Sequence, residues 1–91
     1  MANPVIITCP ADAWTPVAIK VSTGLIHRKL SIPLYLQTYR DTGETAPTSR
    51  DEGVPVFVDS NTAVISAAAN IDVYLWAIGK PGEVRVDLPG E

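Results

Sequence analysis

The sequence offers few residues that could do chemistry. It has one histidine, His27, and one cysteine, Cys9. Ser/His/Asp catalysis needs a nucleophile on a constrained turn beside a positioned histidine, and the sequence has no G-x-S-x-G pattern. Zinc needs three or four Cys or His ligands, or two His with a carboxylate. We therefore expect no such site, and we expect His27 at the surface or an interface and Cys9 buried as a small apolar residue.

The acidic residues do not match a known site either. Asp41, Glu44, Asp51 and Glu52 fall in one segment, but their spacing is not that of an EF-hand. With ten acidic residues, many pairs of carboxylates could be chosen for glycoside hydrolysis, so no such pair is evidence for this activity unless a cleft brings the two together. The sequence has no P-loop and no G-x-G-x-x-G pattern. We expect a protein that is not an enzyme and has no cofactor.

A long polar segment, residues 41–53, follows Arg40 directly and contains Arg50 near its end, and each of these arginines is followed by an acid. Loops longer than about 12 residues in a compact domain are usually functional or disordered. Its only apolar anchors are Ala46 and Pro47, so we expect an arm that a neighbouring protein orders. The flanking charges are either a solvated cluster or intersubunit pairs that set register in a ring or lattice.

Composition limits the compartment and the partners. The chain of 91 residues is one domain, 1–91, with 46% hydrophobic residues and a net charge of −3. Its densest basic stretch is residues 27–29, so nucleic acid and anionic membrane surfaces are poor partners. No apolar stretch approaches the roughly 20 residues of a membrane span, and the N-terminal residues lack the features of a signal peptide. A single cysteine excludes an intramolecular disulfide, which fits folding in a reducing cytoplasm.

The elements that hold these residues are predicted to be strands. Residues 83–88 alternate, with Val84, Val86 and Leu88 on one face, and eight prolines with six glycines indicate many turns. Pro55 predicts an edge strand or a bulge. The region 63–70 is read as a short strand and a turn rather than a helix. The strand candidates are residues 5–9, 17–21, 24–30, 34–40, 54–58, 63–66, 71–78 and 83–88. We expect an all-β fold, a small antiparallel β-sandwich or jelly roll of about eight short strands.

One predicted strand is apolar on both faces. Residues 73–78 place Tyr74 and Trp76 on the face that a two-layer sandwich leaves uncovered, so another subunit or a long loop must cover them. Tyr35 and Tyr39 could line a similar outer face, although core burial or loop cover is the alternative for all these aromatics. We expect a homo-oligomer. The candidate interface residues are Tyr35, Tyr39, Arg40, Arg50, Tyr74 and Trp76.

Over nearly its full length the chain resembles small structural proteins of tailed bacteriophages. The resemblance lies in a tryptophan segment at 12–18 followed by 21–24, and in a tyrosine strand with a T-G-x-x-A-P segment at 35–47. It continues in Glu52-Gly53 and in the closing segments 71–77 and 82–87. None of these segments has a catalytic signature.

The resemblance implies a virion protein with a β-sandwich fold, made in the host cytoplasm. Among virion positions we favour a capsid decoration (cement) protein that binds the outer shell as an oligomer. The alternative within the particle is a neck, collar or tail ring component, with capsid, neck or tail proteins as partners. A carbohydrate-binding module that uses Trp14, Tyr35, Tyr39 or Trp76 is the alternative from another class.

Overall fold

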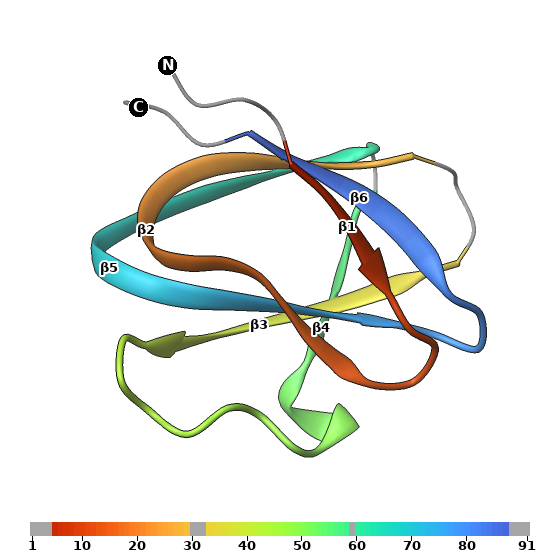
Figure 1. Cartoon of the computed structure of the whole chain (residues 1–91), viewed down its shortest axis with the longest axis horizontal. Helices are drawn as coiled ribbons and strands as arrows, with labels where there is room; N and C mark the ends of the chain where they lie inside the picture. The colour runs from red at the N-terminus through yellow and green to blue at the C-terminus, as the bar shows by residue number, and fades with distance from the viewer. Residues whose placement is uncertain (1–4, 30–32, 59, 88–91) are drawn as a thin grey trace.

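The described part of the chain folds as one antiparallel sheet with six strands in the order β1-β6-β2-β5-β3-β4 (Figure 1). This computed structural model describes residues 5–29, 33–58 and 60–87. The elements are β1 (Val5–Cys9), β2 (Trp14–Arg28), β3 (Tyr35–Asp41), the 3-10 helix η1 (Arg50–Glu52), β4 (Val54–Val56), β5 (Thr62–Ala77) and β6 (Gly82–Asp87). The expected all-β antiparallel fold is therefore confirmed.

The strands form a single sheet curled as a half-barrel, where the sequence predicted two packed sheets and about eight strands. The count differs because two predicted breaks are bends within continuous strands. Residues 17–21 and 24–30 both fall in β2 up to Arg28, and residues 63–66 and 71–78 both fall in β5 up to Ala77. Leu30 and Leu88, the last residues of two predicted strands, lie outside the described residues.

The bend in β2 has a defined cause. The register between β2 and β5 shifts at three places between Pro16 and Thr23, and bulges of this kind increase the bend and twist of a strand. Lys20, inside this stretch, has a φ of 57°, in the left-handed region. Its backbone N–H donates a 3.0 Å hydrogen bond to the buried carboxylate of Asp72 on β5. Ser22 and Thr23, which separate the predicted strands 17–21 and 24–30, therefore lie in a bulged stretch of one continuous strand.

The bends divide the sheet into two wings that share β2 and β5 (Figure 1). In the β3 wing, residues 14–21 and 71–77 pair with each other, and β3 and β4 follow on the other side of β5. In the β6 wing, residues 23–28 and 62–66 pair with each other, and β6 and β1 follow on the other side of β2.

The core lies between the inner faces of the two wings. Tyr35 of β3 and Phe57, just after β4, meet edge-to-face with ring centroids 5.6 Å apart. Arg28 stacks over the Phe57 ring at 5.4 Å. The other core side chains are apolar: Cys9, Val17, Ala18, Ile26, Ile65, Ile71, Val73, Leu75, Ala77, Val84 and Val86. As Pro55 predicted, β4 is an edge strand of the sheet.

Candidate interaction surface

The outer face of the β3 wing holds a second aromatic cluster. Trp76 on β5 lies directly opposite Trp14 on β2 and Leu36 on β3, so these three side chains form one row across the sheet. The two indole rings meet edge-to-face, with centroids 5.4 Å apart and planes at 68°. This is the second apolar face that the two-sided strand predicted.

The chain's own long loop covers part of this row. The Trp14 indole N–H donates a 3.0 Å hydrogen bond to the carbonyl of Ser49. A Cβ added at Gly53 would lie 2.6 Å from Trp14 Cη2 and 2.8 Å from Leu36 Cβ, so the loop backbone lies directly on the aromatic row. Of the two covers that the sequence left open, another subunit or a long loop, the structure shows the loop for this part of the face.

The loop is also organised within itself. Ser49 and Glu52 form a capping box around η1, in which Glu52 Oε2 accepts 3.0 Å hydrogen bonds from the backbone N–H groups of Thr48 and Ser49. The guanidinium of Arg40 pairs with the carboxylate of Glu52. Pro47 is buried, whereas Ala46 is exposed. Pro47 is the anchor that the sequence predicted, but the expectation that residues 47–53 have few other anchors is wrong, because Trp14 and Arg40 also hold this part against the domain.

The predicted interface aromatics fall into different environments. Tyr35 is 2% exposed and belongs to the core, so the expectation that it lines an outer face is wrong. Its position follows from its contact with Phe57, whose left-handed φ of 62° lies just beyond the end of β4. Tyr39 is 58% exposed. Tyr74 is buried on the outer face of β5, opposite Thr38, and Trp76 is partly buried beside Trp14.

The two predicted arginines are both associated with the loop. Arg40 is partly buried by its ion pair with Glu52, and Arg50 is exposed on η1. The structure therefore brings Arg40, Tyr74 and Trp76 to one covered face, whereas Tyr35 and Tyr39 point to the other side of β3. Trp14, which sequence reasoning did not place in this cluster, connects Trp76 to the loop.

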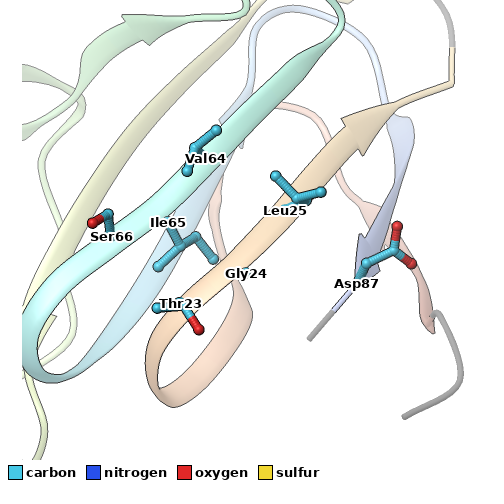
Figure 2. A pocket seen from close by; sticks show the side chains of 7 residues that line it. All are labelled: Thr23, Gly24, Leu25, Val64, Ile65, Ser66 and Asp87. Atoms are coloured by element: carbon cyan, nitrogen blue, oxygen red, sulfur yellow. The ribbon is translucent and has the colours of Figure 1, made fainter. Parts of the chain in front are cut away.

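A second surface, on the outer face of the β6 wing, was not predicted. Leu25 on β2 and Val64 on β5 lie directly opposite each other and are 38% and 69% exposed. Together with Thr23, Ser66 and Asp87 they surround an open hollow of about 520 Å³ (Figure 2). The available signal was the alternation in residues 63–66, which sends Val64 and Ile65 to opposite faces, so that only one of them can enter the core.

His27 lies on the same outer face. Its Nδ1 is 3.2 Å from the Thr62 hydroxyl, and its Nε2 is 3.0 Å from Asp87 Oδ2, which also pairs with Arg85 at 3.1 Å. The order hydroxyl, imidazole, carboxylate is that of a hydrolytic triad. However, Thr62 is part of a regular strand pair and not of a constrained turn. We read the row as a cross-strand polar network, in agreement with the expected surface position of His27.

Cys9 is fully buried at the end of β1. Burial raises the pKa of its thiol from 9.0 to about 11, so the thiolate that reacts as a nucleophile is scarce near neutral pH. The described residues contain no group of three or more His, Cys, Asp or Glu side chains placed to bind a metal ion.

Comparison with known proteins gave no relative: no family model, no curated protein and no solved structure matches the chain. Within the part of the chain that the structure describes, no helix has the length and apolar character needed to cross a bilayer.

Proposed function

We propose that the chain is a non-enzymatic structural protein of a bacteriophage virion that decorates the outer capsid shell as an oligomer. The observation that supports this most directly is the set of apolar side chains left open on the β6 wing. Leu25 and Val64 are exposed and lie opposite each other on β2 and β5, and adjoining exposed apolar residues are typical of protein contact sites. Exposed single residues are ordinary, but Leu25 and Val64 adjoin each other over a hollow.

The decoration role and its alternatives make different demands on the surface. A carbohydrate-binding module needs open aromatic rings, and of the four proposed for it Tyr35 lies in the core while Trp14 and Trp76 contact each other. Only Tyr39 is largely open, so the aromatic surface gives this alternative little support. A neck, collar or tail ring component would use the same kind of apolar contact as a decoration protein, so only an experiment distinguishes these two roles.

The test is cosedimentation of the full chain with purified, mature capsid shells and, in parallel, with separated tails. We expect binding to shells, and we expect Val64→Lys to weaken it at least tenfold because the charge enters the apolar hollow. Lys80→Ala is the matched control, because Lys80 is an exposed residue in the turn before β6. Binding to tails alone would assign the neck or tail alternative, and binding to neither particle would overturn the proposal.

A further inference from the structure

Two polar or charged side chains are buried among the described residues, Gln37 and Asp72, and only one of them is hydrogen-bonded. Asp72 accepts a hydrogen bond from the Lys20 N–H. The side-chain amide of Gln37, a residue that is 9% exposed, has no hydrogen bond to any described residue. A buried amide without a partner costs free energy, because it has given up its hydrogen bonds to water. An apolar side chain at this position would make the fold more stable.

Gln37 borders a hollow of about 470 Å³, the inner hollow, which lies between the two wings. The side chains around it come from both wings: Gln37, Tyr39, Val54 and Val56 from β3 and β4, and Ala63 and Val64 from the start of β5. The amide of Gln37 is not fully enclosed by protein, so a molecule in the inner hollow can reach it. Hollows of this size with a few polar groups among apolar walls are typical of small-ligand sites.

The charges around the inner hollow indicate an uncharged ligand. Glu52 alone among the described residues that border it carries a charge. One oxygen of its carboxylate pairs with Arg40, and the other accepts hydrogen bonds from the backbone N–H groups of Thr48 and Ser49. A charged ligand would therefore lose its hydration here without gaining a free opposite charge. The polar group that is left to bind a ligand is the amide of Gln37.

We propose that the inner hollow binds a small, flat, uncharged molecule with the edge of a cyclic amide, an N–H beside a C=O. The carboxamide of Gln37 presents an oxygen acceptor next to an N–H donor. A cyclic amide presents the same two groups on one side of its ring, so two parallel hydrogen bonds can form. One peptide bond of a protein partner does not offer this edge, because its trans geometry directs the N–H and the C=O to opposite sides.

The other side chains suit the body of such a ring. Tyr39 lies two residues after Gln37 on the same face of β3, and it is 58% exposed. An open tyrosine ring packs well against a flat ring. Val54 lies directly opposite Gln37 on β4 and is 62% exposed, so it adds an apolar wall beside the amide. The hollow thus combines one amide with an aromatic ring and apolar walls.

This inference goes beyond the proposed function and does not depend on it. Decoration was argued from Leu25 and Val64 on the outer face, whereas the ligand site is centred on Gln37 on the inner face. Val64 borders both hollows, so it stays unchanged in the tests below. Ligand binding is measured on the isolated protein, and decoration is measured with capsid shells, so either proposal can fail without the other.

The first test is a titration of the full chain, labelled with ¹⁵N, with 2-pyridone, a flat cyclic amide, followed by NMR. Gln37 is the only glutamine in the sequence, so its side-chain amide signals are identified by their loss in Gln37→Met. We expect saturable shifts of these signals and of the backbone signals of Tyr39 and Ala63. The matched probe, 1-methyl-2-pyridone, should bind at least fivefold more weakly, because a methyl group replaces its N–H.

The second test uses variants. Gln37→Met keeps the length of the side chain and removes the amide, so binding of 2-pyridone should weaken at least tenfold while the melting temperature stays equal or rises. Tyr39→Ser changes an exposed residue and should also weaken binding. Leu25→Ser is the matched control, an exposed residue of the outer hollow, and should leave binding unchanged.

Three results would overturn the inference. The first is a titration without saturable shifts around the inner hollow. The second is equal binding of 2-pyridone to the parent and to Gln37→Met, or equal binding of the two probes, because the amide would then have no part in recognition. The third is a Gln37→Met variant with a lower melting temperature than the parent, which would show that the amide stabilises the fold without a ligand.

Discussion

Lys20 and Asp72 join the two bends of the sheet: the backbone N–H of Lys20 donates a 3.0 Å hydrogen bond to Asp72 Oδ1. Lys20 has a left-handed φ of 57°, and Asp72 is one of the two buried polar or charged residues among those described. Burial of a carboxylate costs free energy unless the group is hydrogen-bonded. This hydrogen bond therefore compensates for the burial of Asp72 and also holds the bulge at Lys20 in place.

Removing this acceptor should destabilise the fold. Asp72→Ala leaves the Lys20 N–H without its partner, and we expect the free energy of unfolding to fall by about 1–3 kcal/mol. Asp72→Asn keeps a side-chain oxygen in reach and should cost less. Urea denaturation followed by circular dichroism measures both, and an Asp72→Ala variant as stable as the parent would show that the bend holds without this bond.

The two tryptophans of the outer row should respond differently to the same change. Trp14→Phe removes the hydrogen bond to Ser49, so we expect a loss of about 1 kcal/mol and faster amide exchange in residues 47–53. Trp76→Phe is the matched variant. Its indole N–H is buried and has no partner among the described residues, so its removal should cost less stability than Trp14→Phe. Equal losses in both variants would indicate that ring packing, and not the Ser49 bond, holds the loop.

Hydrogen exchange on the free protein tests the loop itself. The contacts of Trp14, Arg40 and Pro47 predict protection in residues 47–53, while the exposed residues 42–46 should exchange fast. Uniformly fast exchange from 42 to 53 would restore the idea of an arm that only a partner orders.

Gly82 is expected to tolerate no larger residue, because neighbouring side chains leave no room for a Cβ atom. A Cβ at this position would overlap the Tyr35 hydroxyl and lie 2.7 Å from Pro33 Cδ. Gly82→Ala should therefore lower the free energy of unfolding by about 1–3 kcal/mol. The double variant with Tyr35→Phe should recover part of this loss, since it removes one of the two overlaps. Thermal unfolding of the two single variants and the double variant gives the coupling.

Stability should fall in alkali. Burial raises the pKa of Cys9 from 9.0 to about 11, and that of Tyr35 from 10.0 to about 12. The folded state holds these protons more tightly than the unfolded state, so their contribution is complete below pH 9 and is lost as pH rises toward 11 and 12. Cys9→Ala should remove the slope between pH 9 and 10 and reduce it between pH 10 and 11, where the Tyr35 contribution remains. If the denaturant concentration at the unfolding midpoint stays constant as pH rises from 9 to 12, the assignment is contradicted.

Sequence periodicity was sufficient for the strands but not for their connections. The alternation in residues 83–88 predicted a strand, which is confirmed up to Asp87, and the proline at position 55 correctly predicted an edge strand. The segment Ser22-Thr23-Gly24 has turn chemistry, yet it lies in a strand because bulges and the Asp72 carboxylate allow the bend without a break. That carboxylate is 52 positions away from Lys20 in the chain, and no local pattern contains such a contact.

The candidate surface was predictable only in part, for a similar reason. The two apolar faces of residues 73–78 predicted a cover over Trp76, but the choice between a loop and another subunit depends on Trp14 and Ser49, which are far apart in sequence. Tyr35 and Tyr39 have the same strand phase, and the position of Phe57 decides that Tyr35 is buried and not exposed. The position of β1 at the edge of the sheet follows from the strand order, which periodicity does not contain.

The sharing of β2 and β5 by both wings also determines how the protein can fold and unfold. Each wing contains one half of β2 and one half of β5, so unfolding of one wing removes the support for these strands in the other. We therefore expect one cooperative unfolding transition with no half-folded species. The outermost pair of the β6 wing joins β1 to β6, from the two ends of the described chain. Such non-local pairings must close large loops before they contribute stability, so we expect folding to be slow for a chain of this length. We expect the pairing of β6 with β1 to be a late step.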